Sequence, residues 1–583
     1  MTILRTNTVC SRGKGINRWS TLALFALSVG CGAQTVQPAS STGGKNSGGA
    51  SFGAGGASST STGGVQSAVG GSSMGDTSQN FGPAVGYTVH VLSGDSLSAH
   101  AVTINGLSVD TSSVEAIDRS VQAIIDAPNT STIVESATDP ASVTSDLTVD
   151  FTGAATPVPT TFYGANLQWR SKFFLEDPRW RALVKHTPLG LLRFPGGQER
   201  VRYDGKDSIS GTVAADTLAV TATQPYEFRI SGQDVASYIG LCKELNIAAE
   251  PEVNLTVDDP NMWVSLVNQI VTDLKYDLKY VSVGNESDIK SGNGNWDILG
   301  AVGTNDAERR ADAFARYTTR YLEYQQAISA VKPGLTYAYG ELGSWGAGQL
   351  GSYFDAILGG LAGNQPGALS VHWYMLGDWG QAKSDNGYPS IEHLAAVGNG
   401  NNSIAYLSTI AGTLRTTAAA HGLLKQKLFI GEFGTSWSAT AGDATMADRL
   451  AAALFNVEAQ ETGKLTGVDS MQWFGLSDPT SFAPWVPSLI AMDDSTGKPT
   501  ARAQYYIYLM YKHLYGNETV PVAGGQQADW SVYASRDNSK NYLLLINRTA
   551  DKQIVRVVKA VTQAGERLLR LTLNPHSVSV VAF

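Results

Sequence analysis

Cysteine, charged residues and long apolar segments are all scarce in this chain. Only 3 of its 583 residues are cysteines: two fall within residues 1–31, and Cys242 lies in the apolar stretch 238–242. A disulfide framework in the mature chain is therefore excluded, and Cys242 is expected to be a small buried side chain. Charged residues make up 16% of the chain and the net charge is −9, so we expect no nucleic-acid partner.

Sequence patterns for metal and cofactor chemistry are also missing. The chain has no His-Glu-x-x-His motif, no paired cysteines and no phosphate-binding loop, and its 8 histidines are scattered. We therefore expect neither a metal nor a cofactor.

The first 31 residues have the features of an export signal. Basic residues precede an apolar run at 21–29, which is too short to span a membrane. The run ends in small residues before Cys31 and so resembles a bacterial lipoprotein signal, which implies lipidation of Cys31. Ser28 departs from the usual aliphatic residue, so ordinary signal cleavage remains the alternative. We expect an exported protein, either secreted or held at the cell envelope, whose membrane contact is only through that lipid anchor.

A linker and two β-rich segments flank the central part of the chain. Residues 32–84 are dominated by glycine, serine, threonine and alanine, which is typical of a flexible tether. Residues 85–160 alternate apolar and polar positions and predict strands around a helix at 114–125, and residues 516–583 are strand-like again. We expect these two segments to form a small β-sandwich.

Residues 161–515 contain eight apolar runs of strand length separated by helical periodicity. The predicted strands are 162–167, 189–194, 248–254, 280–283, 336–339, 368–372, 427–430 and 467–473. The clearest helices are 233–245, 262–274, 307–330, 405–421, 446–461 and 501–513. This alternation predicts an α/β fold, a (β/α)8 TIM barrel. A doubly wound sheet fits less well because no glycine-rich turn follows the first strand.

Two glutamates follow strands of this predicted barrel. Glu286 comes after the fourth strand and Glu432 after the seventh. Because the carboxyl ends of barrel strands surround one open mouth, we expect both side chains in a single site. A pair of carboxyl groups is what breaks a glycosidic bond: one protonates the departing oxygen while the other attacks or activates water. The pair predicts a glycoside hydrolase.

The order of the motifs at the strand ends resembles that of clan A retaining glycoside hydrolases. The motifs are Arg-Phe-Pro-Gly-Gly from Arg193, Gly-Asn-Glu ending at Glu286, His-Trp-Tyr from His372, and Gly-Glu-Phe-Gly around Glu432. Within the clan they are most similar to the branch of arabinofuranosidases and heparanase-like β-glucuronidases. The similarity extends over residues 161–583.

This resemblance implies a role for each matching residue. Glu286 is expected to be the acid/base, Glu432 the nucleophile, and Asn285 the group that binds the sugar 2-hydroxyl. Arg193 and Tyr374 are expected to hold Glu432 ionised and oriented. The remaining residues expected to line the sugar site are His372, Trp473, Asn254 and Trp169. A structural core role is the alternative for His372, and a loop-supporting role for Asn254.

The sugar itself stays open at this stage. Basic residues near the mouth favour a uronic acid, as in a glucuronidase, but solvent-facing charge is the simpler explanation for them. They are Arg170, Lys172, Arg200, Arg202 and Lys290. The alternatives are an arabinofuranosidase, an endo-acting xylanase or glucanase, and a surface lipoprotein that binds glycans without cleaving them. The oligomeric state is also open.

Overall fold

The computed structural model describes most of the chain beyond residue 80. The described ranges are 81–94, 102–127, 134–137, 143–197, 201–210, 228–255, 260–289, 296, 299–343, 348–361, 363–375, 404–435, 450–480, 488–527, 529–549 and 553–583. The predicted export signal with Cys31, and the predicted linker up to residue 80, lie outside these ranges and stay predictions.

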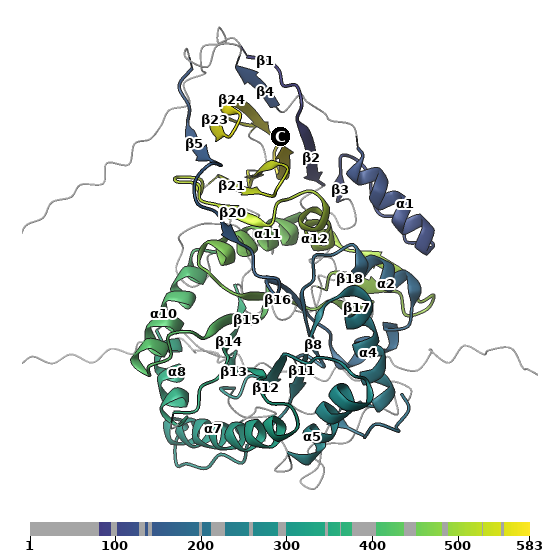
Figure 1. Cartoon of the computed structure of the whole chain (residues 1–583), viewed down its shortest axis with the longest axis vertical. Coiled ribbons are helices and arrows are strands. Elements are labelled where there is room, and N and C mark those ends of the chain that lie inside the picture. Colours follow the sequence, from purple (N-terminus) through teal and green to yellow (C-terminus); the bar gives the residue numbers. More distant parts are fainter. Residues whose placement is uncertain are drawn as a thin grey trace, which may run out of the picture.

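Eight parallel strands close into a barrel in chain order, which confirms the predicted α/β fold class, a TIM barrel (Figure 1). They are β7 (Tyr163–Asn166), β8 (Leu191–Phe194), β11 (Ala248–Val253), β12 (Tyr280–Val283), β13 (Thr336–Leu342), β14 (Ala368–Tyr374), β15 (Lys427–Gly434) and β16 (Ser470–Phe474). Three of them, β13, β14 and β15, run two to four residues beyond the predicted ends at 339, 372 and 430. These extensions carry several polar residues of the site described below.

Helices surround the barrel on the outside (Figure 1). They are α2 (Pro178–Lys185), α4 (Gly232–Leu245), α5 (Asn261–Asn268), α7 (Asp306–Val331), α8 (Leu350–Gly359), α10 (Tyr406–Ala420), α11 (Leu450–Leu465) and α12 (Ala503–His513). The sequence sets their starts: Ser231 and Asp234 form a capping box on α4, and Asn305 caps α7. The predicted helix at 262–274 is α5 followed by a single π-helical segment, Gln269–Asp273.

The strands alternate between side chains that face the barrel interior and side chains that face the helices. At one level of the interior, Leu191, Ala338, Ala368 and Phe429 form a small apolar cluster. Two residues further along these strands, the interior positions are polar, as at Arg193 and Ser370. The barrel therefore has an apolar base beneath a polar layer.

The second domain is a β-sandwich built from both ends of the described chain. One sheet holds β1 (Phe81–Pro83), β4 (Val134–Ala137), β24 (Gly565–Leu573), β23 (Ile554–Thr562) and β5 (Leu147–Asp150). The other holds β3 (Thr103–Ile104), β2 (Thr88–Ser93), β25 (Ser577–Ala582), β22 (Asn541–Asn547), β21 (Trp530–Arg536), β20 (Glu518–Val520) and β6 (Thr156–Pro157). Strand β2 pairs with β25 and β5 with β23, so the N-terminal segment completes both sheets, as the sequence predicts.

The remaining elements are short and are attached to these two domains. Helix α1 (Val114–Ile125) packs on α2, where Asp118 accepts a hydrogen bond from His186 Nε2 at 2.7 Å. Small sheets are formed by β9 (Val201–Tyr203) with β10 (Phe228–Ile230), and by β17 (Ser477–Pro479), β18 (Ile490–Met492) and β19 (Pro499–Ala501). Among the helices of the described residues, none has the length and apolar character to cross a bilayer.

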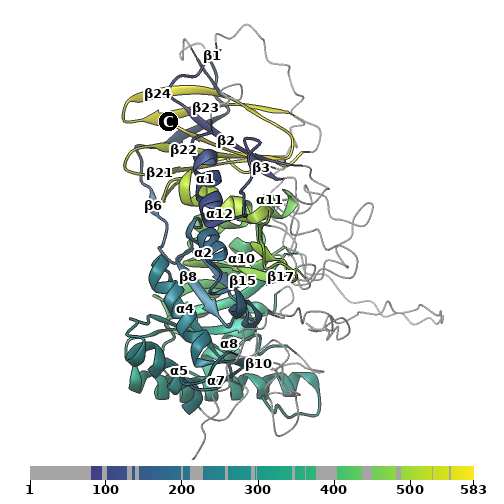
Figure 2. The same cartoon turned by 90° about the vertical axis from the view of Figure 1, so that its right-hand side faces the viewer.

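Helices α11 and α12 lie between the barrel and the sandwich (Figures 1 and 2). Almost every residue of α11 is buried because the sandwich covers the side that would otherwise face solvent. Glu458 of α11 forms an ion pair with Arg548, which follows β22, and both side chains are fully buried. Tyr533 Oη donates to Glu458 at 2.5 Å and Arg548 Nη1 donates to Ser531 Oγ at 2.8 Å. A buried charged network therefore joins the two domains.

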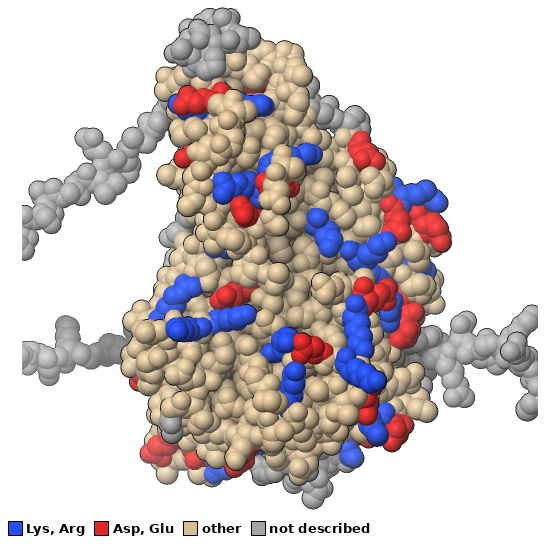
Figure 3. All heavy atoms as spheres, viewed as in Figure 1, with Lys and Arg blue, Asp and Glu red and all other residues tan. Residues whose placement is uncertain are grey.

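Charges of both signs are mixed on the face shown in Figure 3. Lysine and arginine lie beside aspartate and glutamate in small groups, and neither sign forms a continuous field over the described residues of this face. The described surface also carries ion pairs, such as Arg181 with Glu244 at 2.5 Å. Such exposed pairs contribute little to stability.

Arg548→Met tests the joint between the domains. Removing one partner leaves Glu458 buried without its counter-ion, so the free energy of unfolding should fall by about 3 to 5 kcal/mol. Urea unfolding followed by tryptophan fluorescence measures the change. Lys559→Met is the matched control, because Lys559 pairs with Glu566 at 2.7 Å on the sandwich surface and should cost less than about 1 kcal/mol. Equal losses in the two variants would contradict this assignment.

Candidate active site

Three of the predicted residues meet at the mouth of the barrel. Glu286 follows β12, His372 lies on β14 and Glu432 on β15, and one ring or carboxylate atom from each lies within 4.8 Å of the other two. Glu432 and His372 are 3% and 1% exposed, and Glu286 is 9% exposed. The two glutamates predicted from positions 146 residues apart (432 − 286) therefore share one site.

Glu432 is held from three sides. Arg193 Nη1 donates to its Oε1 at 2.8 Å, Tyr374 Oη donates to its Oε2 at 2.7 Å, and His372 Nδ1 lies 3.5 Å from Oε2. A register shift between β14 and β15 adds one residue at Gly431, so that Glu432 points into the barrel rather than outward. These contacts fix the direction of the carboxylate.

Glu286 depends on the backbone of β13. Its own backbone is in the left-handed region, with φ of 48°, and its N–H donates to the backbone oxygen of Glu341 at 2.7 Å. A side chain at Gly343 would place a Cβ 2.2 Å from Glu286 Oε1. Because glycine has no side chain, Gly343 leaves room for the Glu286 carboxylate.

Arg193 lies at the centre of the polar layer and is fully buried. Besides Glu432, its guanidinium contacts Glu252 at 3.0 Å and donates to the side-chain oxygens of Asn285 and Asn166, each at 3.0 Å. Its Nε donates to Ser282 Oγ at 3.1 Å. Burial lowers the pKa of Arg193, but the surrounding glutamates raise it by more, so it remains a cation.

The two glycines after Arg-Phe-Pro fit the chain around this cluster. A Cβ at Gly196 would lie 2.4 Å from Asn166 Oδ1, and one at Gly197 would lie 3.2 Å from Glu432 Oε1. The N–H of Gly197 donates to Glu252 at 3.0 Å. The glycines therefore let the β8 loop approach the site closely.

His372 lies between three carboxyl groups. Its Nδ1 is 3.0 Å from Glu286 Oε1 and its Nε2 is 2.8 Å from Glu341 Oε2. Burial lowers the pKa of His372, but Glu432, Glu286 and Glu341 raise it to about 10. Burial likewise raises the pKa of Glu341, while Arg193 and His372 bring it to about 2. Both shifts favour an imidazolium ring beside an ionised Glu341.

The ionisation of Glu432 reflects opposing effects. Burial raises the pKa of its carboxyl and so does Glu286, whereas His372, Arg193 and Tyr374 lower it. The neighbouring carboxylate and the two cations therefore act on the Glu432 carboxyl in opposite directions.

The cluster of Glu286, His372 and Glu432 also has the composition of a metal site. Both ring nitrogens of His372 face carboxylates, so the residues present form a network of ion pairs.

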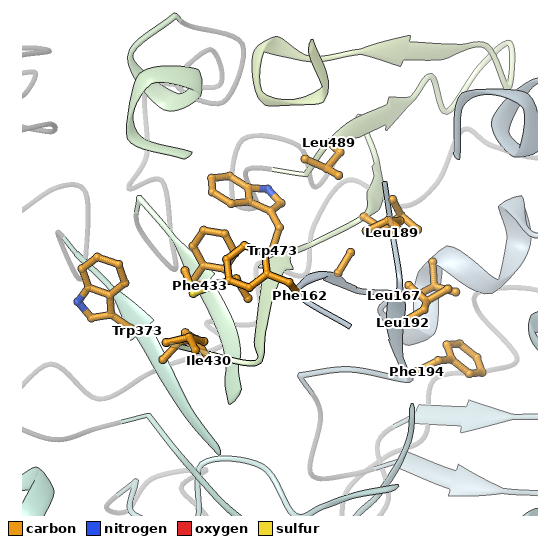
Figure 4. Packing of buried hydrophobic residues seen from close by; sticks show 14 of the residues in the cluster. Phe162, Leu167, Leu189, Leu192, Phe194, Trp373, Ile430, Phe433, Trp473 and Leu489 are labelled. Carbon is orange, nitrogen blue, oxygen red and sulfur yellow. The ribbon is translucent and has the colours of Figure 1, made fainter. Parts of the chain in front are cut away.

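The expectation that Trp473 lines the site is wrong, because its side chain faces the helices. It is fully buried, and its ring is 5.0 Å from Phe433 and 6.3 Å from Phe455 (Figure 4). On β16 the interior positions alternate with it: Gln472 donates to Glu250 inside the barrel at 2.7 Å. Phe474, one residue later, lies at the site, with its ring 5.9 Å from that of Tyr374.

The other two predicted contact residues are also buried. Trp169 is 5% exposed and stacks on Phe228 with ring centroids 4.4 Å apart. Asn254 is 1% exposed and donates a hydrogen bond to the backbone oxygen of Val201, which is the loop-supporting role that the sequence left open.

The described basic residues near the mouth are engaged in ion pairs. Arg170 Nε contacts buried Asp478 at 2.6 Å, and Lys172 Nζ lies 3.6 Å from Asp234 and donates to a backbone oxygen. Arg202 contacts Asp204 at 3.1 Å. Arg200 and Lys290 lie outside the described residues.

Sequence reasoning missed several polar residues of the site. They are Asn166, Glu250, Glu252, Ser282 and Glu341, together with the aromatic Phe474. Asn166, Glu250, Glu252 and Ser282 lie within predicted strands, where a charged or polar residue in an apolar run is the signal that marks them. Glu341 and Phe474 lie beyond the predicted strand ends and carry no such signal. Glu250 and Glu252, two residues apart on β11, carry this signal most clearly.

Sequence comparisons give no family assignment. No protein-family model matches the chain, and no curated protein matches it.

Solved structures, in contrast, match the fold. The α-L-arabinofuranosidase of Thermotoga maritima in its arabinose complex has a TM-score of 0.51 at 14% identity, over 76% of this chain and 100% of that chain. A 4-O-α-L-rhamnosyl-β-D-glucuronidase of Fusarium oxysporum has a TM-score of 0.53 at 12% identity, over 75% and 100%. A bifunctional glucanase-xylanase from a metagenome library has 0.51 at 13%, over 75% and 98%.

These proteins are clan A glycoside hydrolases, so the resemblance drawn from the strand-end motifs is confirmed at the level of fold. The chain shares the barrel fold of these solved structures. Function at this similarity is a separate inference.

Glu250→Gln tests the charge balance of the polar layer. Burial and Glu341 raise the pKa of Glu250 to about 8. The folded protein keeps this proton between about pH 4.5 and 8 while the unfolded chain loses it, so this carboxyl makes stability fall as pH rises through that window. Relative to the variant, the wild type should lose on the order of 2 to 4 kcal/mol of unfolding free energy between pH 5 and 9.

Urea unfolding at pH 5, 7 and 9 measures this difference. Glu244→Gln is the control, because the Glu244 side chain is 51% exposed and pairs with Arg181 on the surface. Its difference from wild type should be nearly the same at each pH. A difference for Glu250→Gln that does not grow with pH would contradict the raised pKa.

Proposed function

We propose that this protein is a retaining glycoside hydrolase that acts through Glu286 and Glu432. The observation that carries the proposal is the distance between the two glutamates, with one oxygen of each within 4.8 Å. Retaining enzymes hold their carboxyl groups about 5 Å apart, whereas inverting enzymes leave a wider gap of about 6.5 to 9.5 Å for a water. The fold shared with clan A hydrolases supports the same conclusion.

The proposed reaction has two displacements at the anomeric carbon. In the first, the Glu432 carboxylate attacks that carbon while Glu286 gives its proton to the departing glycosidic oxygen, which leaves a glycosyl ester on Glu432. In the second, the Glu286 carboxylate takes a proton from water as the water oxygen attacks the same carbon. The ester bond to Glu432 breaks, and both glutamates return to their starting states.

The surrounding contacts match these roles. Arg193 and Tyr374 stabilise the ionised Glu432 and aim it into the mouth. Asn285 is oriented because its side-chain oxygen accepts from Arg193, which places its amide NH2 as a donor for the sugar 2-hydroxyl. The proposed machinery is thus organised around one guanidinium.

The described basic residues near the mouth favour a neutral sugar over a uronic acid as the substrate. Arg170 and Lys172, which would recognise a uronate carboxylate, are buried in contacts with Asp478 and Asp234. We therefore infer an arabinofuranosidase-like activity, with a glucuronidase-like activity as the second candidate. A panel of nitrophenyl glycosides distinguishes them, and activity on polymers alone would indicate an endo-acting enzyme.

We also infer that the protein is exported and held by a lipid at Cys31. The inference rests on the leader sequence. Labelling with a fatty-acid analogue in wild type and in Cys31→Ala would test it.

Azide rescue tests the two glutamates separately. Glu432→Gly should lower kcat on a nitrophenyl glycoside by about 10⁴-fold or more, and azide should then yield a glycosyl azide of inverted configuration. Glu286→Ala should retain more activity on a substrate whose leaving group needs no proton, and azide should give the retained configuration. Wild-type turnover in either variant without azide would refute the assignment, and complete inactivity of wild type on all glycans would favour the glycan-binding alternative.

Phe474→Ala and Trp473→Phe test which aromatic meets the sugar. Loss of the Phe474 ring should raise KM by about 10-fold through lost stacking. Because Phe474 is only 9% exposed, the melting temperature should fall as well. Trp473→Phe removes buried volume far from the sugar, so the melting temperature should fall while KM stays constant. Kinetics and thermal unfolding of both variants measure this, and the reverse pattern of KM values would contradict the placement.

A further inference from the structure

Glu341 is a buried carboxylate to which the proposed reaction gives no direct role. It lies on β13 and is fully buried, and its carboxylate accepts from Ser282 Oγ at 2.9 Å and from His372 Nε2 at 2.8 Å. Its backbone oxygen accepts the N–H of Glu286. Glu341 therefore contacts the site through its side chain and its main chain.

The other ring nitrogen of His372 faces both proposed catalytic glutamates. Its Nδ1 is 3.0 Å from Glu286 and 3.5 Å from Glu432. A histidine ring donates from both nitrogens only when it carries two protons. Three glutamates face the ring of His372: Glu341 on β13, Glu432 on β15 and Glu286 after β12. The neighbouring cation is Arg193, whose guanidinium lies 3.7 Å from Glu341.

We propose that Glu341 is a positioning residue that keeps His372 as an imidazolium shared between Glu286 and Glu432. The shared cation contacts both carboxyl groups and holds them at the separation that double displacement needs. Glu341 does not touch the substrate, and its effect on turnover rests on the proposed function. Its effect on the charge of His372 is independent of the proposed function.

Structural support for Arg193 is a weaker explanation for this carboxylate. Arg193 has closer partners in Glu432 at 2.8 Å and Glu252 at 3.0 Å. Glu341 also occupies an unfavourable backbone conformation, with φ of 45°, at a register shift in β13. A Cβ at Gly431 would lie 2.5 Å from its Oε2, so the neighbouring strand also makes room for it. These features aim the carboxylate at His372.

Histidine NMR of the full-length protein tests the proposal without any substrate. In protein with labelled histidine, the His372 signal is assigned by its loss in His372→Asn and should remain that of an imidazolium up to about pH 9 in wild type. In Glu341→Gln its titration midpoint should fall by about 1 to 3 pH units. Ser370→Ala is the matched control, a buried neutral side chain on the strand of His372, and should leave the midpoint unchanged.

Two results would overturn the proposal. One is a wild-type His372 whose titration midpoint lies near the ordinary histidine value. This result would refute the proposal even if Glu341→Gln does not fold. The other is an unchanged midpoint in folded Glu341→Gln. Glu341→Asp, which keeps the charge, should restore most of the wild-type titration.

Kinetics then separate this proposal from the proposed function. Glu341→Gln should lower kcat by about 10- to 100-fold with little change in KM, and should shift the basic limb of the pH profile to lower pH. A protein that shows the NMR shift but hydrolyses no glycoside would uphold the role of Glu341 and refute hydrolysis. A hydrolase whose His372 titration midpoint is unchanged in Glu341→Gln would uphold hydrolysis and refute the role of Glu341.

Discussion

The buried guanidinium of Arg193 is the group on which the rest of the site depends. A cation with no solvent contact is stable only where carboxylates and amide oxygens replace water, and the barrel supplies Glu432, Glu252, Asn285 and Asn166 for this. Each of these partners comes from a different strand or strand end. Arg193 therefore fixes the geometry of the mouth and the charge of the glutamates at the same time, and its removal would leave several carboxylates without compensation.

Two departures from regular strand pairing deliver the carboxylates to that cation. The register shifts in β13 and β15 turn Glu341 and Glu432 into the interior, and glycines at 431 and 343 leave space for the neighbouring glutamates. The sandwich lies on the opposite side of α11 and α12, away from these shifts (Figures 1 and 2). Local irregularity is thus confined to the part of the barrel that carries the polar groups, while the apolar base stays regular.

The sequence predicted the barrel well because its evidence is local. Runs of apolar residues mark strands that are covered by helices, and the eight runs give the order of the barrel directly. Glu286 and Glu432 were predictable for the same reason, since each follows such a run. Glu341 also lies just after such a run, but no motif at that strand end carried the resemblance, so it was not singled out. The prediction for Trp473 was wrong by one position, because side chains alternate along β16 and the neighbouring Phe474 faces the site.

The charge inside the barrel is the last constraint on the chemistry. Among the described residues that line the polar layer and the catalytic cluster, five glutamates (Glu250, Glu252, Glu286, Glu341 and Glu432) surround the two cationic side chains Arg193 and His372. Cleavage of a glycosidic bond builds positive charge at the anomeric carbon. In the proposed reaction, a site with more carboxyl groups than cations therefore favours the transition state over a neutral ground state, while the two cations limit the cost of burying those carboxyl groups.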